Sequence, residues 1–398
     1  MQRAGGLDPR KKNLFRDLLW KACCEGDYGM LQRLLEKYDE QRGRADVTEL
    51  SVSPLFANIN THNQGMNALF AACGYGHHDC ASLLLQKGAN VNHVANDGIS
   101  ALFPACLSGH RACVSLLIDH GVNLNQVDNN GYNALFVASQ EGHRDCASLL
   151  IDHGVNLNQV DSSGQSALFG ACKGHRECVS LLLNFGINVN QVDSDGCNAL
   201  FSACEDGHHA CVSLLIDHGV NVNQKDKNKH SALLFSIVVV SVRCVLHLLE
   251  NGAVVMQLDK EAAVVCNSVK CLALVLRAAG LEHINANNSG GKLLRLARQL
   301  KHSEIESFLL DNGATGDGTG SSYEPGLDEF IALCTNANKT ARGERKLVRR
   351  CDYPGCDRDV PMEQLKKCKQ CGEFWYCSKE HQLGHWKEHK AMCEKLRL

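Results

Sequence analysis

At 398 residues the chain is longer than one ordinary domain, which takes about 100–200 residues, so we expect more than one folding unit. Hydrophobic residues make up 44% and charged residues 21%, as in a soluble globular protein, and a net charge of −3 argues against polyanion binding by the whole surface. The 22 cysteines and a polar N-terminus without an apolar signal segment predict a reducing compartment, cytoplasmic or nuclear, where cysteines serve as core residues or metal ligands.

The N-terminal part of the chain predicts helices and then a strict repeat. Residues 14–46 are interpreted as a helical unit, and behind them the pattern [N/S]-A-L-F recurs at steps of 32 or 33 residues. The copies begin at Asn67, Ser100, Asn133, Ser166 and Asn198, with a weaker copy at Ser231. A fixed period of this length predicts a stack of small, nearly identical units.

Each copy predicts two short helices and an extended arm. In the first clear copy, ALFAACGYGH forms a helix that ends at Gly76, and CASLLLQKG forms a second helix from Cys80 to Gly88. The following NVNHVANDG predicts an arm with a tight turn at Asp97–Gly98. The leucines at 83–85 cannot all be buried inside one short unit, so neighbouring units must cover them.

Capping residues mark the helix ends. Asn67 or Ser100 stands where the first helix needs an N-cap, because its side chain can accept hydrogen bonds from unpaired N–H groups of the first turn. Pro104 lies inside the first helix of its copy and predicts a local distortion. Glycines in the left-handed conformation are expected just past the second helix; they are Gly88, Gly121, Gly154, Gly186 and Gly219.

Ten cysteines recur in two phases of the repeat. Equivalent positions in adjacent units should lie about 8–10 Å apart, and a disulfide needs Cα atoms closer than about 7 Å. We therefore interpret these residues as small buried hydrophobes and not as a metal or redox ladder. They are Cys73, Cys106, Cys172 and Cys204 in the first helix, and Cys80, Cys113, Cys146, Cys178, Cys211 and Cys244 in the second. The apolar run 231–249 follows the same register and contains Arg243 and His247, so we expect no membrane span.

These features closely resemble the ankyrin repeat. The resemblance rests on G-x-[N/S]-A-L-F-x-A, on a following G-H pair and on L-L-x-x-G-x-x-x-N, and it covers residues 65–258. It implies a mainly α solenoid of helical hairpins over residues 1–315, with 14–46 as the N-terminal cap, 259–285 as a degenerate unit and 286–315 as the C-terminal cap. The usual opening T-P-L-H is changed here, because alanine replaces proline and phenylalanine replaces histidine.

The turn tips are the predicted protein-binding surface of the array. Residues that flank the turn glycine differ from copy to copy, whereas the scaffold is nearly constant, with LLIDHGVNLNQVD present twice. Variation on a fixed frame suggests partner contacts; the alternative is that solvated tips drifted after duplication. The candidate contact residues are Asp97, Ile99, Asn130, Tyr132, Gln165 and Asp195.

Residues 316–350 are interpreted as a linker, because Gly, Ser and acidic residues open it. Its basic end, 341–350, is either a solvated linker or a localisation signal. The segment that follows, 351–393, contains metal-ligand residue types in close spacing. They are Cys351, Cys356, Cys368, Cys371, Cys377 and Cys393, with His381, His385 and His389. Six cysteines and two histidines make eight ligands, which fits two Zn²⁺ ions with four ligands each.

Helical spacing divides these ligands. Cys377 and His381 lie one turn apart, as do His389 and Cys393, and the two pairs are about 18 Å apart along a helix. One zinc ion cannot reach both pairs, so an upstream cysteine pair must complete each site. Spacing alone does not say which upstream pair goes to which site. The count leaves His385 over.

The segment resembles the MYND-type zinc finger, through C-x4-C, C-x2-C and Y-C-S-x3-Q-x2-H-W-x2-H-K-x2-C over residues 351–393. The resemblance implies that two structural zinc ions are held in an interleaved arrangement. Cys351, Cys356, Cys377 and His381 would bind one ion, and Cys368, Cys371, His389 and Cys393 the other. His381 stands where the family usually has cysteine. With every coordination position filled by protein, hydrolysis by the metal is not expected.

The same resemblance implies a peptide-binding groove. It would lie near Gln382 and Trp386, beside the strand that reads FWYC, and take short proline-containing segments. Trp386 is equally interpretable as core packing.

The sequence therefore predicts a non-catalytic adaptor that binds one protein through the array and a second through the finger. Three alternatives are a transcription-associated protein, a nucleic-acid-binding zinc finger and a methyltransferase-associated protein. Residues 341–398 carry 14 Lys and Arg against 9 Asp and Glu, which is modest for nucleic-acid binding. The repeats leave no room for a methyltransferase domain. No membrane partner is expected.

Overall fold

The computed structural model describes residues 9–42, 65–280 and 289–315, together with four two-residue strands between positions 349 and 376. Contacts within the chain divide it into two compact units, residues 1–194 (unit 1) and 195–398 (unit 2). The described part of each unit is dominated by short helices in antiparallel pairs. The predicted mainly α fold is confirmed.

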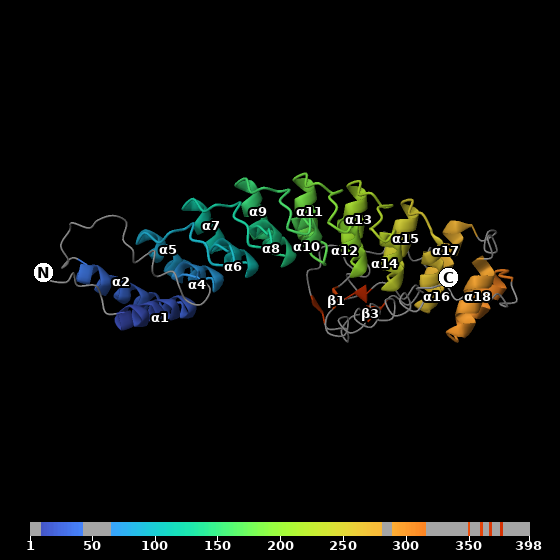
Figure 1. Ribbon diagram of the computed structural model, residues 1–398, viewed down its shortest axis with the longest axis horizontal. Helices are drawn as coiled ribbons and strands as arrows, with labels where there is room; N and C mark the ends of the chain where they lie inside the picture. Colours follow the sequence, from blue (N-terminus) through green and yellow to red (C-terminus); the bar gives the residue numbers. More distant parts are fainter. Residues whose placement is uncertain are drawn as a thin grey trace. The chain divides into compact units, whose positions relative to one another are not determined.

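Unit 1 contains five helix pairs among its described residues. They are α1 (Pro9–Glu25) and α2 (Tyr28–Arg42), α4 (Ala68–Gly74) and α5 (His78–Gln86), α6 (Leu102–Leu107) and α7 (Arg111–Asp119), α8 (Ala134–Gln140) and α9 (Arg144–Asp152), and α10 (Ala167–Ala171) and α11 (Arg176–Asn184). From α4 to α11, first helices pack on first helices and second helices on second helices, in chain order (Figure 1).

Side-chain capping starts several of these helices. Asn67 Oδ1 accepts a hydrogen bond of 2.8 Å from the N–H of Phe70, and Asn133 caps α8 in the same way. Ser100 is not an N-cap: α6 begins one residue later, behind Ala101, and the N–H of Phe103 bonds to the Ser100 carbonyl instead of its hydroxyl. The same bond to a backbone carbonyl, without a side-chain cap, occurs at Ser166 and Asn198, so it does not depend on Pro104.

The Gly-His pairs connect successive repeats. The His143 ring bonds through Nε2 to the carbonyl of Leu107 in the preceding unit, at 3.0 Å. A Cβ atom on Gly109 would lie 2.5 Å from Nδ1 of the same ring, so only glycine fits there. The glycines predicted to follow the second helices do adopt positive φ, between 76° and 85°. They are Gly88, Gly121, Gly154, Gly186 and Gly219.

The core is a layer of aliphatic side chains between the helices. Leu135, Leu150 and Phe169 are at most 2% exposed in unit 1. Burying a side chain of this size stabilises a fold by about 1.5–3 kcal/mol. Leu83, Leu84 and Leu85, which were predicted to be covered by neighbouring repeats, are at most 8% exposed, and α5 packs on α2 and α7, so that prediction is confirmed.

All ten repeat cysteines are buried and none of them forms a disulfide, as predicted. The prediction considered only equivalent positions and missed a diagonal contact. In this contact, the first-helix cysteine of one repeat meets the second-helix cysteine of the next repeat. Cys73 and Cys113 are joined by a hydrogen bond between their thiols, which lowers the pKa of Cys113. Burial raises the pKa of Cys146 to about 11, so this thiol stays neutral at physiological pH.

Unit 2 continues with helix pairs and ends with two short hairpins. The helices are α12 (Ala199–Glu205) and α13 (His209–Asp217), α14 (Ala232–Val238) and α15 (Val242–Glu250), α16 (Gln257–Val265) and α17 (Val269–Ala279), and α18 (Ser289–Gln299) and α19 (Ser303–Asp311). The strands β1 (Arg349–Arg350) and β2 (Asp359–Val360) pair antiparallel, as do β3 (Lys366–Lys367) and β4 (Trp375–Tyr376). The apolar run 231–249 divides into α14 and α15, and no described helix is long and apolar enough to cross a membrane.

In unit 2 the connection from the second helix pair to the third is shorter than the connection from the first pair to the second. Residues 218–231 join α13 to α14 through an extended arm and a turn, whereas residues 251–256 alone join α15 to α16. The arm and turn are therefore missing from the repeat that contains α16 and α17.

Candidate protein-interaction surface and zinc finger

An aspartate organises the turns at Gly131 and Gly164. Asp128 Oδ1 accepts hydrogen bonds from the backbone N–H groups of Asn130 (2.9 Å) and Tyr132 (2.8 Å). Asp161 does the same for Ser163 and Gln165. The glycine between these partners has positive φ, for example 88° at Gly131. The turn is held by its own side chain, so its tip is a rigid frame.

Each of the four turns at Gly98, Gly131, Gly164 and Gly196 is covered by the turn of the following repeat through two hydrogen bonds. The first runs from a backbone N–H to the carbonyl of the residue before the turn glycine: Asn129 to Asp97, Ser162 to Asn130, Ser194 to Ser163, and Lys227 to Asp195. The second runs from a glutamine side chain to the carbonyl of the glycine itself: Gln126 to Gly98, Gln159 to Gly131, Gln191 to Gly164, and Gln224 to Gly196.

The six predicted contact residues lie on these turns, but they are not equally exposed. Asn130 and Asp195 are exposed, whereas Asp97, Ile99, Tyr132 and Gln165 are half-buried. Their role as partner contacts stays a prediction.

Tyr132 and Gln165 have a second role inside the chain. The Tyr132 ring packs on Phe136 with ring centres 4.3 Å apart, and its hydroxyl bonds to Asp161 of the next turn. Burial and the Asp161 charge raise the pKa of Tyr132. Gln165 Nε2 donates to Asp193 of the next turn at 3.2 Å. The side chain after the turn glycine therefore reaches the aspartate of the next turn.

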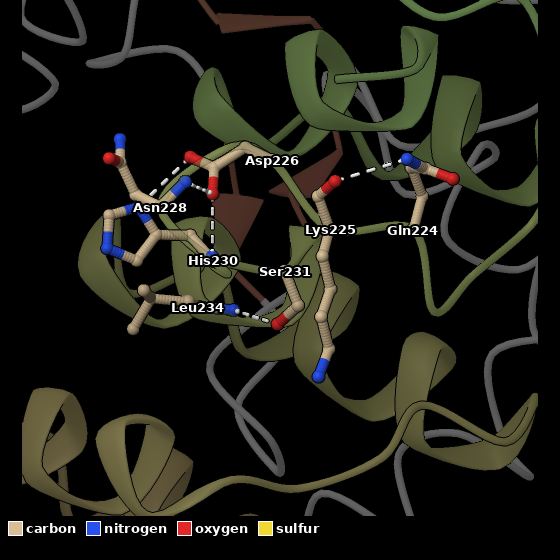
Figure 2. A network of polar contacts seen from close by, with 7 residues as sticks. All are labelled: Gln224, Lys225, Asp226, Asn228, His230, Ser231 and Leu234. Atoms are coloured by element: carbon tan, nitrogen blue, oxygen red, sulfur yellow. Dashed lines mark hydrogen bonds and ion pairs between the residues drawn. The ribbon is translucent and has the colours of Figure 1, made fainter. Parts of the chain in front are cut away.

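The turn at 225–230 keeps this frame but changes its chemistry. Asp226 Oδ1 accepts from the N–H groups of Asn228 (2.9 Å) and His230 (2.7 Å), and Asp226 Oδ2 bonds to His230 Nδ1 at 3.0 Å (Figure 2). Lys229, with φ of 67°, takes the place of the turn glycine. Sequence reasoning missed this turn, although the signal was present: the glycine column is broken only here among the [N/S]-A-L-F copies.

Three lysines line this turn and are all exposed: Lys225, Lys227 and Lys229. Asp226 is directed inward, with its side chain 9% exposed. Figure 2 shows the Lys225 side chain extending away from the Asp226–His230 network. Lys227 reaches Asp195 at 3.8 Å, but both side chains are more than two-thirds exposed, so this ion pair contributes little.

The predicted zinc ligands, Cys351, Cys356, Cys368, Cys371, Cys377, His381, His389 and Cys393, lie outside the described residues, as do Gln382 and Trp386. The paired strands next to them are described. Pairing of Arg350 with Asp359 joins the ends of the segment that contains Cys351 and Cys356, and pairing of Lys367 with Trp375 does the same for the segment with Cys368 and Cys371.

The donor set fits zinc, because thiolate and imidazole are its preferred ligands and each hairpin carries one close cysteine pair. Elsewhere, the residues that the structure describes contain no cluster of three or more His, Cys, Asp or Glu side chains suited to a metal ion.

Comparison with known proteins identifies both modules. The family model for ankyrin repeats matches residues 19–128, 123–193 and 174–259, and the model for the MYND finger, a zinc-binding domain, matches residues 334–393. The crystal structure of the human ASB11 ankyrin repeat domain is similar at 28% identity and a TM-score of 0.45, covering 54% of this chain and 89% of that domain.

Two curated proteins are similar over short segments. Human Egl nine homolog 1 is 44% identical over 43 residues, which are 11% of this chain and 10% of that protein. The hypoxia-inducible factor prolyl hydroxylase of Caenorhabditis elegans is 33% identical over 73 residues, 18% of this chain and 10% of that protein. The chain thus spans about a tenth of the length of these relatives.

Proposed function

Because the chain belongs to the ankyrin-repeat family and also carries a MYND finger, we propose that it is a non-catalytic adaptor that holds two protein partners together. Both modules are protein-interaction domains without chemistry of their own. The observation that carries the proposal is the row of turns, where a constant hydrogen-bonded frame presents variable tips such as Asn130 and Asp195 to solvent. Joining two binding modules in one chain raises the local concentration of one partner near the other.

The proposal assigns no reaction to the chain. The hydroxylase relatives share only a short segment with it, so their activity is not carried over. Both zinc sites are proposed to be filled by protein ligands, which leaves no position for a reacting water.

Two zinc ions are part of the proposal. Cys351, Cys356, Cys377 and His381 would hold one ion, and Cys368, Cys371, His389 and Cys393 the other. Native mass spectrometry of the full chain should show two tightly bound ions. The variant Cys371→Ser should bind one ion, and His385→Ala should keep both. A wild-type mass with one ion or none contradicts the assignment.

The finger is proposed to bind a proline-containing peptide through Gln382 and Trp386. Titration of a labelled proline-rich peptide should show binding that a zinc chelator abolishes. Trp386→Ala should weaken it at least tenfold while two zinc ions stay bound. Unchanged affinity would remove the groove assignment.

Affinity capture with the full chain tests the adaptor role. An array variant, Asn130→Ala with Asp195→Ala, and a finger variant, Trp386→Ala, should each lose a different set of captured proteins. A matched control, Lys173→Gln, changes an exposed residue away from both sites. Loss of the same set in both variants, or of none, contradicts two independent modules. We place the chain in the cytoplasm, the nucleus or both, which imaging of a tagged chain with and without residues 341–350 tests.

A further inference from the structure

The turn at 225–230 lacks the cover that every earlier complete turn has. By the register of those turns, the carbonyls of Asn228 and Lys229 should accept from a following N–H group and a following glutamine. Among the residues that the structure describes, no hydrogen bond reaches either carbonyl. The next glutamine and aspartate in register, Gln257 and Asp259, have entered helix α16, where Gln257 bonds to Glu261 and Asp259 caps Met256.

Lys229 is consistent with an open face. A Cβ atom on Gly98 or Gly131 would lie 3.0 Å from backbone atoms of the covering turn, and on Gly196 it would lie 3.3 Å from the carbonyl oxygen of Lys225. Glycine is needed at those positions because another backbone lies against them. At 229 a lysine is accommodated at φ of 67° and is exposed, whereas the four turn glycines are half-buried.

The charge of the open face is basic. Lys225, Lys227 and Lys229 are exposed, and the only carboxylate of the turn, Asp226, is turned inward and bonded to His230. His230 occupies the position of Tyr132 and Gln165, whose side chains reach the aspartate of the next turn. His230 differs from both, because its Nδ1 bonds to Asp226 of its own turn.

We propose that the turn at 225–230 is a docking site for an extended acidic segment of a partner protein, which takes the place of the missing next turn. The earlier turns supply the template: each is covered by a segment Gln-x-Asp-x, in which the glutamine amide and the N–H after the aspartate are the donors. The inference rests on the proposed role of the array as a protein-binding surface and names the partner chemistry of one part of it.

The site combines acceptors with cations, and this selects the class of ligand. Two backbone carbonyls require N–H donors, which a peptide backbone and an amide side chain supply and which inorganic phosphate lacks. The three exposed lysines favour negative charge. A segment with both, such as Gln-x-Asp-x, satisfies the whole surface, whereas a nucleic acid backbone satisfies only the charge.

Fluorescence anisotropy with the full chain and a labelled synthetic peptide tests the proposal. The probe is the capped peptide NVNQVDSDG, which copies residues 188–196 and carries one Gln-x-Asp-x segment and two aspartates. Saturable binding is expected at low salt. A peptide with both aspartates replaced by asparagine should bind about tenfold more weakly, and so should a scrambled peptide of equal charge, since it loses the register of the donors.

Single variants locate the site. Lys227→Gln and Lys229→Gly should each weaken binding about two- to fivefold, as expected for exposed charges. Lys229→Gly also relieves the left-handed backbone, so we expect the variant to stay folded, which its unfolding midpoint checks. Lys173→Gln, an exposed lysine of unit 1, is the matched control and should bind like the wild type.

The proposal is overturned if the scrambled peptide binds as tightly as the probe, or if Lys173→Gln loses as much affinity as the site variants. It is also overturned if inorganic phosphate or a single-stranded oligonucleotide competes as strongly as the unlabelled peptide. Self-association of the chain that the lysine variants abolish would mean that a second copy, and not a partner, occupies the site. If the peptide does not bind but Asn130→Ala with Asp195→Ala still releases captured proteins, this docking site fails and the adaptor role stands. If neither experiment shows binding, both fail.

Discussion

The turns at Gly131 and at Lys229 have the same internal frame and different surroundings. In each, one aspartate oxygen accepts two backbone N–H bonds of 2.7–2.9 Å, and the residue before the second partner has positive φ. Gly131 lies against the backbone of Asp161, whereas Lys229 is exposed. The comparison shows two reasons for glycine at position 131. The backbone there has a positive φ, and the neighbouring turn leaves no room for a Cβ atom.

The last copy of the Gln-x-Asp segment in this register takes a different structure altogether. Gln126–Asp128 and Gln224–Asp226 form turns, but Gln257–Asp259 begins helix α16. The residues that follow explain the difference. NNG and KNK continue the two turns, whereas Lys-Glu-Ala-Ala after Asp259 are good helix formers. The residues that follow a Gln-x-Asp segment therefore decide whether it forms a turn or begins a helix.

The largest predicted effect is on the pH dependence of stability, and it concerns Asp259, which lies in a helix, unlike the aspartates of the turns. Burial raises the pKa of Asp259 to about 6, although its hydrogen bond to the N–H of Met256 acts in the opposite direction. A carboxyl whose pKa is higher in the folded state binds its proton more tightly there than in the unfolded chain. Stability contributed by this group is thus present at acidic pH and lost as pH rises from about 4 to about 6.

The variant Asp259→Asn should lack this loss. Its stability relative to the wild type should rise across that pH window by about 2–3 kcal/mol, measured from urea unfolding at pH 4, 5, 6 and 7. Parallel curves for the two proteins would show that Asp259 does not titrate in this range.

The next effect tests the cover on Gly131. Gly131→Ala places a Cβ about 3.0 Å from Asp161 Cα and puts alanine in the left-handed region, so we expect a loss of about 2 kcal/mol. Lys229→Ala replaces one non-glycine side chain by another at an open site, so it should change the free energy of unfolding by less than ~0.5 kcal/mol. Thermal unfolding followed by circular dichroism checks the pair; equal shifts would mean that the covering turn makes no difference.

Most of the repeat fold could be predicted from sequence, because the information is local. The 32- or 33-residue period, the Asn67 cap and Gly88 each follow from a residue type and its position in one repeat. The Ser100 cap was wrong because the N–H of Phe103 bonds to the Ser100 carbonyl, and residue type alone does not say which of the two serine oxygens accepts. The contact between Cys73 and Cys113 was missed because it is diagonal, between non-equivalent positions of neighbouring units.

The candidate site was predicted only in outline. The variable turn tips were identified, but half-burial of Tyr132 and its bond to Asp161 depend on how the next turn packs. The open edge at Lys229 depends on a deletion in the repeat that follows, and a search for residues that vary does not detect a missing neighbour. The zinc ligands came from spacing and resemblance, and their sharing between two ions stays a prediction.

A smaller effect tests the frame that the two turns share. Asp226→Ala removes the acceptor of two backbone N–H groups and the partner of His230, and we expect a loss of about 1–2 kcal/mol. Asp226→Asn keeps one oxygen for the N–H groups and should lose less than half of that. Asp128→Ala is the matched variant in the covered turn. Urea unfolding of the three variants compares them, and no loss in Asp226→Ala would mean that the lysine-rich turn is held by other contacts.

The smallest effect has the opposite sign and tests the reason for Lys229. A non-glycine residue in the left-handed region costs about 1 kcal/mol, and glycine there has a larger unfolded-state entropy that offsets part of the gain. Lys229→Gly should therefore stabilise the chain by up to about 0.5 kcal/mol, seen as a small rise in the unfolding midpoint. If Lys229→Gly also weakens binding of the acidic peptide, the lysine favours binding at the expense of stability, which is the pattern of a binding residue. A fall in the midpoint would mean instead that the lysine side chain stabilises the turn, and its presence would then need no partner.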